Sequence, residues 1–266
     1  MTLRSLAANS PSRRANWRAL GLSKEDMEKP KIAVVNSSSE LAICYAHLDG
    51  IARMVKDEIV RFYGFPPEKI DIVYNGVPLE SLRSDEQDRA KTRERLGLGP
   101  EEIAVLFAGS GWERKGLRFA VDAMERQPKS VRLLVAGRGD GRQYPSERVQ
   151  FLGVVPDMPS LYAAADIFVL PTVYDPFSNA CLEALAAGLP VITTRANGFS
   201  EIIENGRHGS VIDDPRDSLA MVEALQFWAD PARRAQARID NLALAAQFDI
   251  SRNVEKTLQI LAGLAA

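Results

Sequence analysis

The chain has 266 residues, of which 46% are hydrophobic and 26% charged, and its net charge at neutral pH is −2. This composition fits an intracellular globular protein with a buried core and gives no reason to expect a nucleic-acid partner. Two cysteines exclude a disulfide framework, and the sequence contains neither a membrane-length apolar run nor the apolar centre of a signal peptide.

The first predicted strand lies near the N-terminus, in the run K-P-K-I-A-V-V-N-S at residues 29–37. Together with Cys44, it resembles the N-terminus of the dihydroxy-acid and sugar-acid dehydratases over residues 13–52. In those enzymes a cysteine at this position ligates an iron–sulfur cluster, which needs several thiolates. Because the chain has only two cysteines, we expect no cluster and no dehydratase chemistry. Residues 1–52 are predicted to be a dehydratase-like fragment, joined by a gene fusion or a rearranged reading frame.

A highly charged run follows at residues 81–96 and predicts an interdomain connection and then a surface helix. Beyond it, the apolar run V-L-F-A predicts a buried strand that ends in the turn Gly109-Ser110-Gly111. Glycines at both ends of this turn let the backbone approach a ligand closely.

The basic pair Arg114-Lys115 comes directly after this turn, before a helix predicted by apolar residues at i, i+3, i+4 and i+7 from Leu117. A guanidinium fork and an ammonium group are the side chains that bind phosphate oxygens. Taken alone, a glycine turn with an Arg-Lys pair is more often a solvated loop, and that alternative stays open at this point.

Short apolar runs then alternate with helical patterns. Strands are predicted at 131–136, 148–155, 167–171, 190–194 and 209–212, with a short helix at 158–166. Such alternation predicts β-α-β units and therefore an α/β fold with a parallel sheet covered on both faces. Ligands of these sheets bind at the carboxyl ends of the strands, where the turns at Gly109, Gly137 and Pro171 fall.

The most informative segment is D-P-F-S-N-A-C-L-E at residues 175–183. A helix entered through the small polar residues Ser178 and Asn179 directs free backbone N–H groups at an anion. The carboxylates of Asp175 and Glu183 can each accept hydrogen bonds from sugar hydroxyls. Phosphate on the amides and sugar on the carboxylates together indicate a nucleotide-sugar. The alternative is that Asp175 is a turn residue and Glu183 a solvated helix residue.

The same segment, continued by A-L-A-A-G-L-P-V, resembles the E-x7-E donor-site segment of the retaining glycosyltransferases of family 4, the lipopolysaccharide-core glucosyltransferases in particular. The resemblance covers residues 53–266. It implies a Rossmann-like parallel sheet, the C-terminal half of a GT-B fold, with a truncated and atypical N-terminal extension. The family pattern begins with Glu, whereas this chain has Asp175, whose side chain is one methylene group shorter.

The resemblance also implies the roles of the site residues. Arg114 and Lys115 grip the donor diphosphate and neutralise charge on the departing nucleotide. The amides of Phe177, Ser178 and Asn179 complete that cradle. Asp175 holds hydroxyls of the sugar, and Glu183 holds the ribose of the nucleotide.

Further donor contacts are implied for the 109–111 turn and for Gly137 and Arg138, although an Arg138 that merely faces solvent is equally open. Asn197 and Glu201 lie in a segment predicted to shape a loop rather than to contact the donor. The chain has no Asp-x-Asp motif, and the basic pair supplies charge where a metal would sit. We therefore expect no metal or other cofactor, with a nucleotide-sugar such as a UDP-hexose as the substrate.

Three regions follow: residues 1–52, a remnant of the acceptor-domain end with the linker at 53–95, and the donor-binding domain at 96–266. Within the second region, residues 56–77 resemble the last helix and strand of an acceptor domain. Near the C-terminus, Val254, Leu258 and Leu261 recur at i, i+4 and i+7. In full-length relatives such a helix crosses back to the acceptor domain, which we expect to be missing here.

The predicted function is transfer of a hexose from a nucleotide-sugar to a glycan or lipid-linked acceptor, in lipopolysaccharide or other cell-surface glycan synthesis. We expect a cytoplasmic location, with peripheral contact at the inner face of the membrane as an alternative. Two other functions stay open. One is a catalytically inactive nucleotide-sugar-binding module, and the other is a structural remnant of a gene fusion that associates with itself or with a partner.

Overall fold

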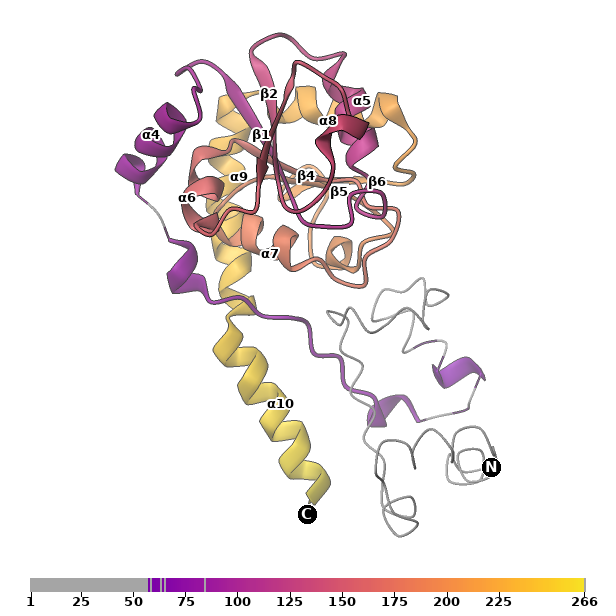
Figure 1. Cartoon of the computed structure of the whole chain (residues 1–266). Helices are drawn as coiled ribbons and strands as arrows, with labels where there is room; N and C mark the ends of the chain where they lie inside the picture. The colour runs from indigo at the N-terminus through magenta and orange to yellow at the C-terminus, as the bar shows by residue number, and fades with distance from the viewer. Residues whose placement is uncertain (1–56, 58, 63, 65, 84, 266) are drawn as a thin grey trace. The chain divides into compact units, whose positions relative to one another are not determined.

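The computed structural model describes residues 57, 59–62, 64, 66–83 and 85–265 (Figure 1). Every described residue belongs to one compact unit, which lies within residues 37–266. The predicted dehydratase-like fragment and its join to the rest of the chain lie outside the described residues.

Six parallel strands form one sheet in the order β3-β2-β1-β4-β5-β6. The strands are β1 (Ile103–Ala108), β2 (Val131–Ala136), β3 (Val149–Gly153), β4 (Ile167–Leu170), β5 (Val191–Thr194) and β6 (Gly209–Ile212). Val105 of β1 pairs with Leu133 of β2 on one side and with Ile167 of β4 on the other. Strand β1 thus lies in the middle of the sheet, and β2 and β3 extend it on one side. The chain then returns past β1 and adds β4, β5 and β6 on the other side, which is the Rossmann-like arrangement. The predicted fold class is confirmed.

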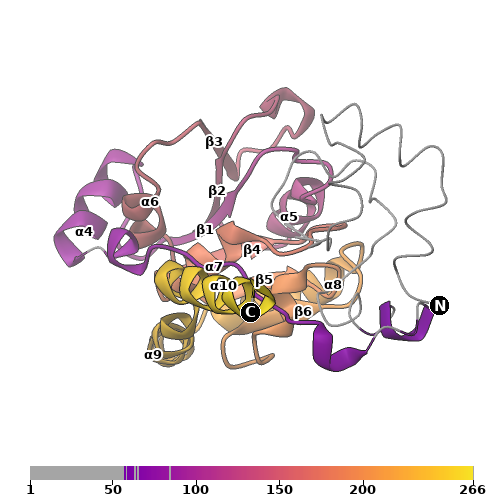
Figure 2. The ribbon, with the colours of Figure 1, turned by 90° about the horizontal axis from the view of Figure 1, so that it is seen from below.

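Helices cover both faces of this sheet (Figure 2). The helices are α4 (Glu86–Arg95), α5 (Leu117–Met124), α6 (Met158–Ala164), α7 (Asn179–Ala186), α8 (Ser218–Trp228), α9 (Pro231–Ala245) and α10 (Ile250–Ala265). Short 3-10 turns are η2 (Pro67–Lys69), η3 (Leu79–Leu82), η4 (Gly141–Gln143), η5 (Gly198–Glu201) and η6 (Ala246–Phe248). On one face α5 packs against α8, and on the other α4 packs against α6 and α7 against α9.

The central strands are apolar along their whole length because helices cover them on both sides. In β1, the side chains of Ala104, Val105, Leu106 and Phe107 are fully buried, and β4 is equally buried. The alternation of apolar runs and helical patterns in the sequence therefore predicted both the strands and the two helical layers.

Most helices begin at a side chain that accepts a hydrogen bond from the backbone of the first turn. Such capping residues precede α4, α6, α7, α8 and α9, and they are Asp85, Asp157, Ser178, Asp217 and Asp230. A capping oxygen satisfies an N–H that has no partner inside the helix, so these residues fix where each helix starts.

The charged run at 81–96 does contain the predicted helix, α4, but the helix is not a purely surface element. Its Arg93 is buried and donates to Asp166, the residue before β4. The charge of this residue serves the packing of α4 against α6 and the loop before β1 rather than contact with water.

The helix and strand expected within residues 56–77 are only partly present. The first described residues of this range are helical, but residues 70–76 form no strand. The Val77 N–H donates to the carbonyl of Phe248, and Ile250 N–H donates back to the carbonyl of Val77. The prediction of a strand was wrong, because this backbone is held by the start of α10 and the described part of the chain offers it no neighbouring strand to pair with.

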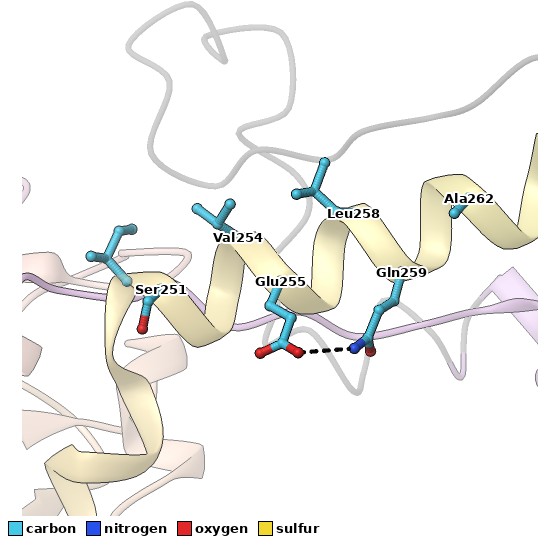
Figure 3. A pocket seen from close by; sticks show the side chains of 7 residues that line it. Ser251, Val254, Glu255, Leu258, Gln259 and Ala262 are labelled. Carbon is cyan, nitrogen blue, oxygen red and sulfur yellow. Dashed lines mark hydrogen bonds between the residues drawn. The ribbon is translucent and has the colours of Figure 1, made fainter.

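The predicted apolar stripe of α10 is exposed. Ile250, Val254, Leu258 and Leu261 are 41%, 49%, 60% and 38% exposed. A groove of about 640 Å³ runs along the helix past Val254 and Leu258, as Figure 3 shows, and Glu255 and Gln259 form a hydrogen bond at its edge. Among the described residues, no helix is both long and apolar enough to cross a membrane.

Candidate donor site

The turns after β1 and β2 meet at the carboxyl edge of the sheet. Gly109 N–H donates to the carbonyl of Ala136 at 2.9 Å. A Cβ on Gly137, whose φ is +129°, would lie 2.0 Å from the Gly109 carbonyl oxygen. Only glycine fits there, because both the backbone conformation and the contact exclude a side chain. The two predicted glycine turns are therefore brought together.

The loop that carries the basic pair is fastened to the loop after β4. A Cβ on Gly116, at φ +76°, would lie 1.9 Å from the carbonyl oxygen of Pro171. The carbonyl of Arg114 accepts hydrogen bonds from Val173 N–H and from Thr172 Oγ1, both at 2.9 Å. These backbone contacts place the start of α5 beside the segment that leads into α7.

Arg114, Lys115 and Asp175 form a charged cluster at this junction. Lys115 Nζ lies 2.7 Å from Asp175 Oδ2, and Arg114 donates to the carbonyl of Tyr174 at 2.8 Å and to Asp175 Oδ2 at 3.5 Å. The Lys115 and Asp175 side chains are only 14% and 7% exposed, whereas that of Arg114 is 49% exposed. Solvent screens the Lys115–Asp175 pair weakly, so the inner part of the cluster is close to neutral and the outer part presents a cation.

The same cluster explains why residue 109 is a glycine. A Cβ at this position would lie 3.4 Å from Cε of Lys115, and Gly109 has a φ of +145°. The stem of Lys115 therefore lies over the turn that follows β1. Arg138, on the neighbouring turn, is exposed, and its N–H donates to Ser110 Oγ at 3.2 Å. The predicted residues of the first two turns thus lie beside the predicted phosphate-binding pair.

The start of α7 departs from the expected three-amide cradle. Ser178 caps the helix through Oγ, but its own N–H donates to Oδ1 of Asn197 at 3.2 Å. Asn197 is fully buried and also accepts from Phe199 N–H, as expected of a residue that shapes the loop. The Ser178 amide is therefore engaged within the chain, which leaves the amides of Phe177 and Asn179 for the predicted cradle.

Glu183 has a different partner from the residues of the charged cluster. Its Oε2 accepts a hydrogen bond from Tyr162 Oη on α6 at 2.8 Å. Among the described residues, Glu183 forms no ion pair with Arg114 or Lys115. Burial raises the pKa of Glu183, and the hydrogen bond from Tyr162 opposes that rise. Tyr162 was not among the predicted site residues, although a tyrosine in the otherwise small and apolar run L-Y-A-A-A is a usable signal.

Cys181 lies between the two carboxylates in the sequence but is a packing residue. Its side chain is fully buried, and burial raises the pKa of the thiol to about 12. A thiol in this state is unreactive, in agreement with its prediction as a small buried residue.

The α10 groove and the charged cluster are separate features. Among the described residues, the groove is lined by α10 alone, and it contains none of the predicted donor residues. The described residues include no group of three or more His, Cys, Asp or Glu side chains arranged to hold a metal ion. The chemistry that the cluster itself can perform is therefore binding of an anion through its half-exposed cation.

A family model described as glycosyl transferases group 1 matches residues 102–230. An uncharacterized glycosyltransferase of Methanocaldococcus jannaschii is 31% identical over 174 residues, which are 60% of this chain and 45% of that protein. The D-inositol 3-phosphate glycosyltransferase of Xylanimonas cellulosilytica is 29% identical over 247 residues, 85% of this chain and 59% of the relative. The chain thus spans about half the length of the curated relatives that it matches.

Solved structures match the fold. Anabaena HepE in complex with UDP and glucose has a TM-score of 0.71 and 22% identity, over 80% of this chain and 62% of that one. WaaG, a glycosyltransferase involved in lipopolysaccharide biosynthesis, has a TM-score of 0.68 and 25% identity, over 78% of this chain and 60% of that one. The sheet and its helices match the Rossmann-like C-terminal domain of GT-B glycosyltransferases.

Proposed function

We propose that this chain binds the donor in a hexosyl transfer. The family model and the structural neighbours support this proposal, because they support the group 1 (GT-B) glycosyltransferase family. The donor is a nucleotide-sugar, and the acceptor is a glycan or a lipid-linked sugar. The observation that carries this proposal is the cluster of Arg114, Lys115 and Asp175 at the carboxyl ends of β1 and β4. This edge of a doubly wound sheet is where such folds bind ligands.

The cluster suits a diphosphate for an electrostatic reason. Arg114 is half exposed and can meet a phosphate first, and Lys115 lies just behind it. When the bond between sugar and phosphate breaks, negative charge grows on the leaving nucleotide, and cations already fixed in place stabilise it without reorganising. The amides of Phe177 and Asn179 would add hydrogen bonds to the same phosphates.

Asp175 and Glu183 keep their predicted roles in this proposal. Asp175 would turn from Lys115 to the sugar hydroxyls once phosphates neutralise that lysine. Glu183 would accept hydrogen bonds from the ribose hydroxyls. No metal is needed in the proposal, because the basic pair supplies the positive charge.

The first donor to test is a UDP-hexose, since the HepE structures contain UDP and, in one case, UDP-glucose. WaaG is involved in lipopolysaccharide biosynthesis, and several relatives are D-inositol 3-phosphate glycosyltransferases. We place the acceptor in cell-surface glycan synthesis, and the protein in the cytoplasm or at the inner face of the membrane.

A second candidate function is a nucleotide-sugar-binding module without turnover. The exposed apolar stripe of α10 does not distinguish this module from the enzyme, because such a face favours association with a second copy or a partner, as in the structural remnant. The two functions share the donor site and differ in whether hexose leaves the nucleotide.

Isothermal titration calorimetry with UDP tests the shared part, with ADP and GDP as matched ligands. We expect heat of binding with UDP, and its absence up to millimolar ligand would refute the donor site. Release of free UDP from UDP-glucose in the presence of candidate acceptors then separates the enzyme from the binding module.

A further inference from the structure

We propose that Tyr162 is a positioning residue that holds the Glu183 carboxylate charged and oriented for the ribose hydroxyls of the donor nucleotide. This inference rests on the proposed function, because it concerns the residue assigned there to the ribose. It assigns to α6, a helix without any of the predicted donor residues, a part in donor recognition.

The hydrogen bond between the two side chains has a single direction. Tyr162 Oη carries one proton and lies 2.8 Å from Glu183 Oε2 and 3.4 Å from the carbonyl oxygen of Ala180. The shorter contact is to a charged acceptor, and charge-assisted hydrogen bonds are the stronger ones. The proton therefore points at Oε2.

Tyr162 is itself held firmly. Its side chain is fully buried, and its ring packs against Phe168 of β4 at a centroid distance of 6.0 Å. A buried phenol needs a partner for its hydroxyl, and Glu183 supplies it. Burial, together with the charge of Glu183, raises the pKa of Tyr162 well above its usual value, so the hydroxyl stays a donor.

In this arrangement the two carboxylate oxygens of Glu183 have different roles. Oε2 is fixed by Tyr162, and no hydrogen bond to Oε1 comes from the part of the chain that the structure describes. An ionised carboxylate only accepts hydrogen bonds, so Oε1 and the remaining lone pair of Oε2 suit the two adjacent hydroxyls of a ribose. If Glu183 were protonated, it would lose acceptor capacity where the ribose needs it.

Other charged groups around α7 are directed elsewhere. On α9, Arg238 donates to the carbonyl of Ala187. On η3, Glu80 pairs with Arg83, and at the start of α5 Lys115 pairs with Asp175. Tyr162 is thus the group that opposes the effect of burial on Glu183. Removing its hydroxyl leaves burial unopposed, which raises the pKa of Glu183 further and moves its protonation to higher pH.

The test measures the affinity for UDP and for 2′,3′-dideoxy-UDP between pH 5 and pH 8, by calorimetry on the full chain. For Tyr162→Phe we expect UDP binding to weaken by about fivefold at neutral pH. When UDP affinity is plotted against pH, its fall on the acidic side (the acidic limb) should shift to higher pH in this variant. The affinity for the dideoxy nucleotide should be the same as in the parent chain. Tyr144→Phe, which removes a hydroxyl that does not contact Glu183, is the control and should match the parent chain.

Glu183→Gln separates the inference from the proposed function. It should weaken UDP binding and abolish the part of the affinity loss at acidic pH that 2′,3′-dideoxy-UDP does not share, because protonation of the terminal phosphate affects both nucleotides. If Glu183→Gln leaves the UDP affinity unchanged, the ribose role of Glu183 fails, and with it this inference. If it weakens UDP but Tyr162→Phe neither weakens UDP nor shifts the limb, only the inference is overturned. Equal weakening of UDP and dideoxy-UDP by Tyr162→Phe also overturns it, because it would show a merely structural role.

Discussion

Two charged clusters lie at opposite ends of the strands of the sheet, and each consists of basic residues around one aspartate. At the amino end of β4, Asp166 accepts from Arg89, Arg93 and the N–H of Ala104. At the carboxyl end, Asp175 accepts from Lys115 and Arg114. The two clusters have similar composition, but their surroundings differ.

The first cluster uses its donors fully within the chain. Both terminal nitrogens of Arg93 bind inside the chain, one to Asp166 and the Ala164 carbonyl and the other to the carbonyls of Gly99 and Glu102. These bonds satisfy groups at the end of α6 and in the loop before β1, and the side chains of Arg93 and Asp166 are each only 9% exposed. This cluster is structural, because it leaves little with which to bind a ligand.

The second cluster is only partly satisfied. The Arg114 side chain is 49% exposed, and its contacts within the described residues are made through a single terminal nitrogen. A partly satisfied cation at a ligand-binding edge is what an anion site requires. The two clusters therefore have the same charge, but they differ in how many side-chain N–H donors have no hydrogen-bond partner among the described residues.

The largest effect expected from this difference is on stability. Arg93→Ala removes four hydrogen bonds, to Asp166 and to the carbonyls of Ala164, Gly99 and Glu102. Arg89 still pairs with Asp166 at 2.6 Å, but the partly buried carbonyls lose their donor, so the free energy of unfolding should fall by about 3–5 kcal/mol. Urea denaturation measures it. Arg83→Ala is the control, because Arg83 and its partner Glu80 are 75% and 80% exposed, and pairs of this kind contribute little. A loss for Arg93→Ala as small as that of the control would contradict a structural role for the first cluster.

The next effect is on ligand affinity. Lys115→Ala should weaken UDP binding by about tenfold or more, since a hydrogen bond to a charged group is worth about 1.5–3 kcal/mol. Its loss of stability should be smaller than that of Arg93→Ala, because the Lys115 ammonium makes one hydrogen bond to the described residues, whereas the Arg93 side chain makes four. Titration calorimetry checks the affinity, with the exposed Lys129→Ala as the matched lysine control. Equal UDP affinities in the two variants would remove the second cluster from the donor site.

A smaller effect is predicted for the length of the carboxylate arm. Asp175→Glu adds one methylene group and should bring the carboxylate nearer to a sugar bound outside the cluster. We expect the affinity ratio of UDP-glucose to UDP to rise by a few-fold, about the effect of one neutral hydrogen bond. Competition calorimetry measures the ratio, and Asp122→Glu on the exposed face of α5 is the control. An unchanged ratio would argue that Asp175 serves Lys115 and not the sugar.

The smallest predicted effect is that of chelation. Because Arg114 and Lys115 supply the positive charge, the affinity for UDP should be the same with EDTA as with added Mg²⁺ or Mn²⁺. Calorimetry in the three buffers checks it. A marked loss in EDTA that either metal restores would show that the cluster does not replace a cation.

Local patterns predicted most of the fold. The apolar runs located all six strands to within a few residues, and the small polar residue Ser178 located the start of α7. The strand expected within 56–77 was wrong, because an apolar run carries no information about whether a neighbouring strand exists to pair with it. The surface helix at 81–96 was correct as a helix but not in the burial of Arg93, since its partner Asp166 lies far away in the sequence.

The members of the candidate site were also selected from sequence, but their contacts were not. Arg114, Lys115 and Asp175 were expected to serve one ligand, and the structure adds that they pair with each other. The use of the Ser178 amide by Asn197, and of the Tyr162 hydroxyl by Glu183, had no sequence signal of comparable strength. Their roles in binding the donor stay predictions.

The sequence by itself determined the elements, the turns that require glycine, and the residue types gathered at strand ends, because these depend on neighbours a few positions apart. The tertiary structure alone decided which of those residues meet. Lys115 and Asp175 are 60 positions apart, and Tyr162 and Glu183 are 21 apart. Such distances are closed only when β4 pairs beside β1 and α6 packs on the same face as α7, and strand order is a property of the packed sheet rather than of any local pattern.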